Sequence, residues 1–502
     1  MTDSSEPVGQ VSPEEAVIAA RAGGLAVVRS DGRGGDVRVN GGERTEIVTI
    51  ETKSLGDRSY LVTDGEVAAV IDPQRDIDRV LAMAERLGVR ITHVFETHVH
   101  NDYVTGGLEL ARVVGADYVL SADEDVEFDR RGVRDGDEVP VGHFSVRAVH
   151  TPGHTPHHLS YVVSEAGRPL AVFTGGSMLY GTVGRTDLIA DDQTEPLTRA
   201  QFRSVRRLAA ELADDVAVQP THGFGSFCSS TQASGTDAST IATERTTNVA
   251  LIVDDEDKFV EQLMSGLTAY PRYYAHMGQR NRRGPAAADL SPPAPVDPVE
   301  LRRRIHAGDW VVDLRARRAF AHSHLAGTVN VELDDQFVTY LGWTIPWGTP
   351  VTLVGDTAEE VAIAQRDLAR IGIDRPAGAA TGGLRKWGAG GELRSYRTAT
   401  FADLAEEVGR TGAIVVLDVR RDDEWSAGHL ERAVHVPLDQ LQDRVSEIPD
   451  GDVWVHCASG YRASIASSLL DRTGRRIVLI DDDWTTAQTQ PRLSHAEPPP
   501  KS

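Results

Sequence analysis

Short apolar runs separated by polar turns fill much of the first half of the chain, and this pattern predicts buried strands. Four runs have the length of a strand: residues 47–50, 59–63, 67–72 and 91–95. Before the last of them, apolar residues recur at helical spacing up to Gly88: Ile77, Val80, Leu81, Ala84 and Leu87. The segment therefore predicts a mixed fold in which several strands lead into polar loops.

The same patterns divide the chain into domains. Residues 1–44 are rich in Gly, Ser, Asp and Arg and predict a flexible tail with one short helix near residues 14–22. A domain of strands and helices is predicted for residues 45–284, and the five prolines of residues 285–298 indicate a linker. Further helices are expected at residues 104–114, 198–212 and 248–277.

An internal duplication follows the linker. Val311-Val-Asp-Leu-Arg315 is repeated as Val416-Leu-Asp-Val-Arg420. Four pairs of matching residues stand 105 positions apart: Asp313 and Asp418, His324 and His429, Val329 and Val434, and Val331 and Val436. One offset at four positions indicates a repeat, and each copy alternates strands with a helix. The pattern predicts two small parallel α/β domains, the first copy (residues 299–392) and the second copy (residues 398–490).

Composition narrows the class of protein. Among 502 residues, 52 are basic and 75 are acidic, which gives a net charge of -23. We expect neither a nucleic acid nor a membrane partner, because phosphate binding needs clustered Lys and Arg. The chain opens without a signal-peptide pattern and holds no apolar run long enough to cross a bilayer. A cytoplasmic protein is therefore expected, with a homo-oligomer left open, and its two cysteines exclude a disulfide framework.

Histidine-bearing loops follow three of the apolar runs. His98, His100 and Asp102 lie within five residues of each other, while His154 and His222 each lie beside a glycine turn that can aim a side chain inward. Neutral imidazole and carboxylate are ordinary ligands of divalent first-row metals. These five side chains predict one metal site at a set of strand ends.

Cys457 is a candidate nucleophile in the second copy. It follows the apolar run 452–456 and precedes a helix, where free N–H groups and the helix dipole favour a thiolate. Arg462 adds a positive charge nearby. The loop between them would also hold an anionic sulfur substrate such as a persulfide, through Ser459, Gly460 and Tyr461.

Residues 45–250 resemble the metallo-β-lactamase superfamily, whose signature is His-x-His-x-Asp-His, a Gly-His turn, a bridging Asp and a last His. The resemblance implies an αββα sandwich with the metal at one edge. Gly184-Arg-Thr-Asp-Leu188 looks like the persulfide dioxygenases of that superfamily, which oxidise glutathione persulfide at one non-haem iron. By this resemblance His98 and His154 bind one divalent metal, with Fe(II) favoured and Zn(II) as the alternative.

Two positions depart from that family. Gly176 stands where the family has the bridging Asp, and Tyr103 replaces the second His of the first motif. A carboxylate-containing iron site then has to be completed in another way. Three side chains remain open as the third ligand: His100, Asp102 and His222. A set of His98, His100 and His154 would look more like a zinc site.

Two residues near these loops have two interpretations each. Arg185 either binds an anionic thiol substrate, as the resemblance implies, or pairs with Asp187 to orient its own loop. Cys228 is either a small apolar core residue or a sulfur relay close to His222.

The second copy resembles the rhodanese family. The resemblance rests on Asp418-Val-Arg420, Glu424-Trp425, Gly428-His429-Leu430 and four residues between Cys457 and Arg462. It implies that Cys457 is the nucleophile and that Arg462, Asp418 and Arg420 support it. One departure is Asp481-Asp-Asp-Trp484, where a Gly-Gly pair usually precedes the Trp.

The first copy has lost this chemistry. Gly355 and Glu360 occupy the positions of Cys457 and Arg462, so that no nucleophile remains and the charge is inverted. We interpret it as a catalytically dead rhodanese-like domain with a structural or docking role.

The order of domains resembles the bacterial persulfide dioxygenase–sulfurtransferase fusions. The implied activity is sulfide detoxification: oxidation of a low-molecular-weight persulfide to sulfite at the metal, and transfer of sulfane sulfur from a persulfide or thiosulfate to a thiol acceptor through a Cys457 persulfide. Three alternatives stay open: a zinc-dependent thioester hydrolase of the glyoxalase II type, a sulfurtransferase with a degenerate metal domain, and a persulfide-binding module without turnover.

Overall fold

A computed structural model describes residues 29–30, 36–41, 44–229, 237–410 and 414–496. The chain divides into two compact units. The first holds the described residues up to His100 with Thr105–Gly266 and Arg280–Ala286, and the second holds Asn101–Val104, Leu267–Gln279 and the described residues from Ala287 onward. The last division falls at the start of the predicted linker.

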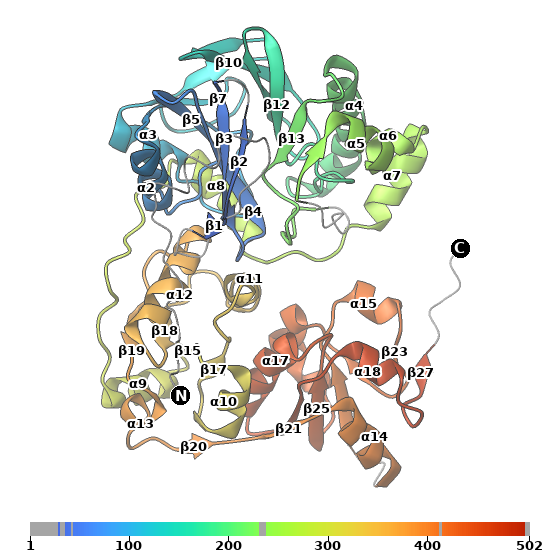
Figure 1. Cartoon of the computed structure of the whole chain (residues 1–502). Coiled ribbons are helices and arrows are strands. Elements are labelled where there is room, and N and C mark those ends of the chain that lie inside the picture. Colours follow the sequence, from blue (N-terminus) through green and yellow to red (C-terminus); the bar gives the residue numbers. More distant parts are fainter. Residues whose placement is uncertain (1–28, 31–35, 42–43, 230–236, 411–413, 497–502) are drawn as a thin grey trace, which may run out of the picture. The chain divides into compact units, whose positions relative to one another are not determined.

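Two β-sheets form the centre of the first unit (Figure 1). Along its described residues the larger sheet runs in chain order: β1 (Arg29–Ser30), β2 (Asp36–Gly41), β3 (Glu46–Thr52), β4 (Asp57–Thr63), β5 (Val67–Ile71), β6 (Arg90–Phe95), β7 (Asp117–Ser121) and β8 (Arg131–Val133). The smaller sheet has the order β14 (Ser239–Thr240), β13 (Ala217–Pro220), β12 (Arg168–Gly175), β11 (Leu159–Glu165), β10 (Phe144–His150) and β9 (Glu138–Val141). Strands β5 to β8 are parallel, whereas β9 to β12 are antiparallel.

The main core of the first unit lies between these sheets. Tyr60 of β4 packs edge-on against Phe173 of β12, and Phe95 of β6 packs in the same way against Tyr161 of β11, each pair with ring centroids 5.0 Å apart. All four rings belong to one buried apolar cluster. The facing aromatic residues hold the strand ends of both sheets close together, which is where the histidine loops begin.

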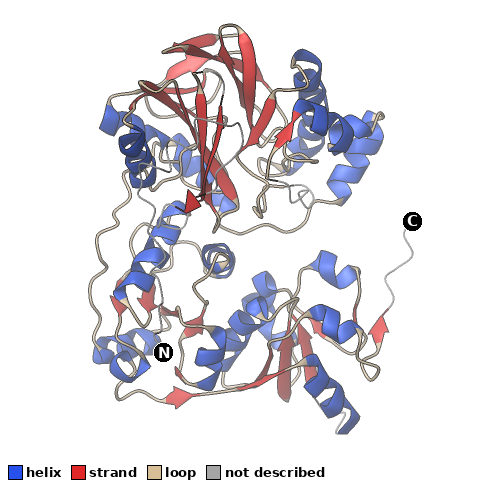
Figure 2. Ribbon diagram, viewed as in Figure 1, coloured by secondary structure: helices blue, strands red, loops and turns tan. Residues whose placement is uncertain are grey.

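Helices cover the outer faces of both sheets (Figure 2). An apolar cluster joins the larger sheet to α2 (Asp78–Leu87) and α3 (Gly107–Val114). Beside the smaller sheet lie η1 (Asp191–Gln193), α4 (Thr194–Glu211), α5 (Ile241–Thr247), α6 (Val249–Ile252) and α7 (Glu256–Ser265). Because helices cover one side and a second sheet the other, β4 is buried along its whole length. The layers are those of the αββα sandwich that the resemblance implied.

The second unit contains two parallel sheets with the same strand order. One has β17 (Val329–Asn330), β15 (Trp310–Asp313), β18 (Val351–Val354) and β19 (Gly378–Ala380). The other has β24 (Val434–His435), β22 (Val415–Asp418), β25 (Asp452–His456) and β26 (Arg476–Ile480), with β21 (Arg397–Ala399) added at the edge. Each is accompanied by an antiparallel pair: β16 (His324–Leu325) with β20 (Leu393–Arg394), and β23 (His429–Leu430) with β27 (His495–Ala496). A duplicated sequence would give this correspondence.

Helices alternate with these strands. Those that precede or belong to the first copy are α8 (Tyr274–Arg282), which crosses the boundary between the units, α9 (Pro298–His306), α10 (Arg317–His322), α11 (Phe337–Thr344), α12 (Ala358–Arg370) and α13 (Leu384–Trp387). Those of the second copy are α14 (Phe401–Arg410), α15 (Asp422–Ser426), η2 (Leu438–Gln440), α16 (Leu441–Arg444), η3 (Val445–Glu447), α17 (Tyr461–Asp471) and α18 (Trp484–Gln488). Among the described residues, none of the helices combines the length and the apolar character needed to span a bilayer.

Three expectations about elements need correction. Residues 36–41, predicted to lie in a flexible tail, form β2 and pair with β3; the helix expected near residues 14–22 lies outside the described residues. The helix expected at residues 248–277 is divided, because Asn248 and Asp255 cap the new helices α6 and α7. The predicted linker also ends in ordered structure, since the Val296 N–H donates to a carbonyl of β19.

Candidate metal centre and cysteine loop

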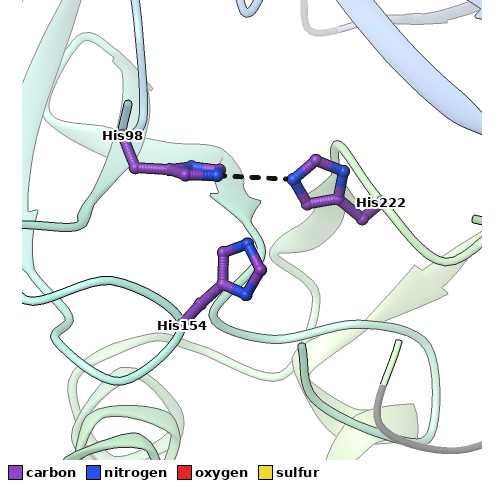
Figure 3. A group of neighbouring side chains, drawn as sticks. All are labelled: His98, His154 and His222. Atoms are coloured by element: carbon purple, nitrogen blue, oxygen red, sulfur yellow. Dashed lines mark hydrogen bonds between the residues drawn. The ribbon is translucent and has the colours of Figure 1, made fainter. Parts of the chain in front are cut away.

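Three histidines from three different strand ends converge in the first unit. His98 follows β6, His154 follows β10 and His222 follows β13, and all three side chains are buried. One nitrogen of each lies within 4.8 Å of the other two, and His98 Nε2 is 3.4 Å from His222 Nε2. Figure 3 shows the three rings turned toward a common centre. The loops that the sequence singled out therefore meet at one point.

The outward nitrogen of each ring has its own partner. His154 Nδ1 lies 2.7 Å from the Arg185 carbonyl oxygen, and His222 Nδ1 lies 3.0 Å from the Asp57 carboxylate. Both partners accept hydrogen bonds, so each Nδ1 carries the proton and each Nε2 keeps its lone pair. His98 Nδ1 lies 2.9 Å from the Thr97 hydroxyl, which itself donates to Asp72. The arrangement fixes the tautomer that a metal ligand requires.

Electrostatics keep His98 neutral. Burial lowers the pKa of His98 well below its ordinary value, and the neighbouring imidazoles of His100, His154 and His222 lower it further. Three buried imidazoles with nitrogens close to one point suit a divalent first-row cation. The residues present therefore fit one metal ion.

Gly176 has no space for the carboxylate that the resemblance would place there. A Cβ atom built on Gly176 would overlap the ring of His154, and one built on Gly184 would meet the Gly176 carbonyl oxygen. The His154 ring thus packs on backbone that only glycine leaves open. Of the three candidates for the third ligand, His100, Asp102 and His222, it is His222 that lies in one group with His98 and His154.

His100 points its Nε2 away from this cluster. That atom lies 3.1 Å from a Glu96 oxygen and 3.3 Å from an Asp72 oxygen. Burial lowers the pKa of His100, but the two carboxylates outweigh it and raise the pKa to about 9, while burial raises the pKa of Glu96 to about 7. Asp102 is buried too and belongs to the second unit. Because Nδ1 of His222 faces Asp57, His222 has one nitrogen left for a metal ion.

Three residues that the sequence did not single out complete the surroundings. Asp72, at a left-handed φ of 49°, accepts from the Thr97 N–H at 2.7 Å and from the Thr221 hydroxyl, and so joins two histidine loops. His158 stacks on His98 with ring centroids 4.9 Å apart, and its Nε2 accepts from the Gly176 N–H at 3.2 Å. The third residue is Asp57, which faces His222. Asp72 could have been found from the sequence because it follows an apolar strand, whereas no sequence pattern marks Asp57.

Replacing Asp57 with asparagine is expected to weaken metal binding by roughly 10- to 100-fold, because an amide can no longer hold the His222 tautomer as firmly. Competition with a chromogenic chelator measures the change. Asp137→Asn, which alters an exposed carboxylate of the same unit, is the matched control. Equal affinities in the two variants would show that Asp57 does not orient the ligand.

Arg185 lies beside His154, and Cys228 lies beside Arg185. The Arg185 guanidinium pairs with both Asp187 oxygens at 2.7 Å and donates to the Phe227 carbonyl oxygen at 3.1 Å. This geometry favours the loop-orienting interpretation, and the Arg185 carbonyl also anchors His154. Cys228 is buried, and its carbonyl oxygen accepts from the Arg185 N–H at 2.8 Å. Substrate binding by Arg185 and sulfur relay by Cys228 stay predictions.

In the second unit, Cys457 stands between β25 and the start of α17, as the sequence predicts. Gly460, at φ 90°, precedes the first helical residue Tyr461. Cys457 is less accessible than we expect for a reactive thiol, since the residue is only 2% exposed. Ser459, further along the loop, is exposed. The thiol thus lies at the inner end of the loop and the helix N-terminus faces it from one side.

The charges around this loop are more balanced than the sequence suggested. Arg462 forms a bidentate ion pair with Glu424, with N–O distances of 2.5 and 2.7 Å, so its charge is shared. Arg420 forms a second buried bidentate pair with Asp418 and stacks 3.8 Å above the Trp484 ring. Asp418 and Arg420 therefore tie the end of β22 to its surroundings and support the loop from outside.

Asp418→Asn is expected to destabilise the second unit by about 3–5 kcal/mol, because it leaves Arg420 buried and unpaired. Burial raises the pKa of Asp418, but His456 and Arg420 outweigh it and hold the pKa below its ordinary value. The contribution to stability is therefore present above a pH of about 4 and is lost as pH falls through the depressed pKa.

Urea unfolding followed by tryptophan fluorescence at pH 7 and at lower pH tests this. The exposed Asp450→Asn is the control. The difference between wild type and Asp418→Asn shrinks in acid; a difference that grew as pH fell would reverse the assigned sign.

Comparisons with known proteins match a part of each of the two units. Residues 57–222 match the metallo-beta-lactamase superfamily, and residues 400–489 match the rhodanese-like domain. The human mitochondrial persulfide dioxygenase ETHE1 is 28% identical over 208 residues, which cover 41% of this chain and 73% of that protein. A hydroxyacylglutathione hydrolase of Rhodospirillum rubrum is 36% identical over 119 residues, 23% of this chain and 45% of that protein.

A solved structure extends the match. The crystal structure of a metallo-beta-lactamase from Staphylococcus aureus superposes with a TM-score of 0.61 at 28% identity, covering 68% of this chain and all of that chain. The chain thus joins a metallo-beta-lactamase domain to a C-terminal rhodanese-like domain, and it is an enzyme.

Proposed function

We propose that the chain oxidises a low-molecular-weight persulfide to sulfite at one metal ion in the first unit and transfers sulfane sulfur through Cys457 in the second. The similarity to the persulfide dioxygenase ETHE1 and the match to the rhodanese-like domain both support a role in sulfur metabolism. The observation that carries the first half is the convergence of three Nε2 atoms, each prepared by a partner on Nδ1.

His98, His154 and His222 would hold the ion. Bound Fe(II) supplies redox chemistry with dioxygen that Zn(II) lacks. Because the three imidazoles are neutral, they leave the positive charge of the ion available to an anionic persulfide, and their burial excludes bulk water from it. The balanced reaction takes one persulfide anion, one dioxygen and one water to one thiol, one sulfite dianion and one proton.

Cys457 would carry the second reaction. Its thiolate attacks the outer sulfur of a persulfide or thiosulfate, the S–S bond breaks, and the thiol or sulfite leaves with the electron pair. The acceptor, a thiolate or cyanide, then attacks the terminal sulfur of the Cys457 persulfide, and the Cys457 thiolate leaves. The N-terminus of α17 and the loop before it stabilise the anionic sulfur at each stage.

A zinc-dependent thioester hydrolase is the second candidate for the first unit. It is favoured by the donor set, since three imidazoles form a usual catalytic zinc site, and by the similarity to a protein named hydroxyacylglutathione hydrolase. In that case the ion would lower the pKa of a water and the second unit would act alone.

Loading the metal-free protein with Fe(II) or Zn(II) separates the two candidates. The proposal predicts that the iron form produces sulfite from glutathione persulfide and that the zinc form does not. The alternative predicts that the zinc form hydrolyses S-lactoylglutathione and that neither form produces sulfite. Sulfite formed equally by both forms would contradict a role for iron.

A further inference from the structure

Within the second unit, the first copy contacts the cysteine loop of the second copy (Cys457–Arg462) directly at Tyr461, and it also contacts a second-copy residue beside this loop, Asp481. The Tyr461 hydroxyl donates to the Glu332 carbonyl oxygen at 2.6 Å, and the Tyr340 ring lies 5.6 Å from the Tyr461 ring. Asp481 follows β26 and lies against Gly460. The first copy, which has no nucleophile of its own, is thus part of the surroundings of Cys457.

Asp481 brings a negative charge next to this loop. A Cβ atom built on Gly460 would overlap the Asp481 carboxylate, so that the carboxylate touches the loop backbone. Its side chain is only 2% exposed, so water screens the charge poorly. A lone carboxylate here would oppose both the Cys457 thiolate and any anionic sulfur donor.

Two arginines of the first copy neutralise that charge. Arg317 Nε lies 2.7 Å from one Asp481 oxygen, and Arg318 Nε pairs with the other. Arg317 also reaches Glu332, at 2.6 Å, so the same residue links both contact points. The Asp481 carboxylate beside the cysteine loop therefore faces two guanidinium groups from the first copy.

This contact is absent from the pattern that the two copies share. The residues 105 positions after Arg317 and Arg318 are Asp422 and Asp423, so the charges are reversed. Asp481 belongs to the acidic run that stands where rhodaneses usually have a Gly-Gly pair. Both sides of the contact thus depart from the repeat, and each departure supplies the charge that the other requires.

We propose that Arg317 and Arg318 of the first copy determine specificity for anionic sulfur donors at Cys457 by neutralising Asp481. This rests on the proposed sulfur transfer at Cys457. The two arginines do not react; they set the charge that a thiosulfate or persulfide anion meets as it enters the loop.

The test compares an anionic and a neutral reagent at the same cysteine. In the full chain carrying Cys228→Ser, the double variant Arg317→Gln/Arg318→Gln should slow alkylation of Cys457 by iodoacetate about tenfold more than alkylation by iodoacetamide, because the exposed charge repels only the anionic reagent directly. KM for thiosulfate should rise by a similar factor with little change in kcat. Adding Asp481→Asn should restore both, because it removes the charge that the arginines neutralise.

Arg394→Gln is the matched control. Arg394 joins the same two copies through Asp471, at the opposite end of α17 from the loop, with an N–O distance of 3.7 Å. It should leave the ratio of the two alkylation rates unchanged.

Two results would overturn the inference: equal slowing of both reagents by the double variant, or a further loss when Asp481→Asn is added. Either would show that the arginines only hold the copies together. The two proposals can also fail separately. If the wild-type chain transfers no sulfur from thiosulfate while the double variant still changes the ratio of the two alkylation rates, the result would contradict the proposed transfer and support the role of the charge.

Discussion

Replacing His154 with alanine is expected to remove the metal ion from the first unit. The variant loses one of three imidazoles, and Gly176 offers no carboxylate in its place. We expect the affinity for Fe(II) or Zn(II) to fall at least about 100-fold, since even loss of an outer partner costs 10- to 100-fold. The metal content of freshly purified protein, by mass spectrometry, measures the change.

His157→Ala is the control for this variant. His157 lies three residues further along the same loop and is not part of the three-histidine group. It should retain about one metal ion per chain. Stoichiometric metal in His154→Ala would mean that the ion is held by other side chains.

Replacing Cys457 with serine is expected to abolish sulfur transfer from thiosulfate to cyanide, by about 10³-fold or more. A serine hydroxyl is not ionised at neutral pH and forms no persulfide, so the covalent intermediate is lost. Thiocyanate formation measures the rate.

Cys228→Ser separates the two cysteines. Cys228 lies buried in the first unit, so its replacement should leave thiosulfate–cyanide transfer unchanged. Full activity in Cys457→Ser, or equal loss in both variants, would show that the nucleophile is assigned to the wrong residue.

Much of the fold was predictable because the chemistry lies at strand ends. Apolar runs ending in polar, glycine-containing loops fixed the positions of β6, β10 and β13, and with them His98, His154 and His222. The duplication was visible as one repeated offset, and the two parallel sheets have the same strand order.

The partners of these residues could not be predicted in the same way. Asp57 is 165 residues from His222, and Asp481 is 164 residues from Arg317, so no local pattern joins either pair. His100 stands two residues after His98, as expected for a second metal ligand, yet its Nε2 faces the buried carboxylates of Asp72 and Glu96. Such pairings follow from tertiary packing, which brings distant loops together only after the sheets have formed.

The absence of a carboxylate at residue 176 affects the net charge of a metal ion bound at this site. Three neutral ligands leave the full charge on the ion, whereas a carboxylate would reduce it by one unit. Under the proposed function, an anionic persulfide would be both the substrate and a ligand that neutralises this charge. A preference for an anionic sulfur compound would then depend on the backbone space that Gly176 and Gly184 give to His154.

Oxygen uptake by the iron-loaded chain with glutathione persulfide tests the central claim most directly. The account predicts one dioxygen consumed and one sulfite formed per persulfide, with both lost in His222→Ala. No uptake above the metal-free protein, in a preparation that contains one iron per chain, would contradict it.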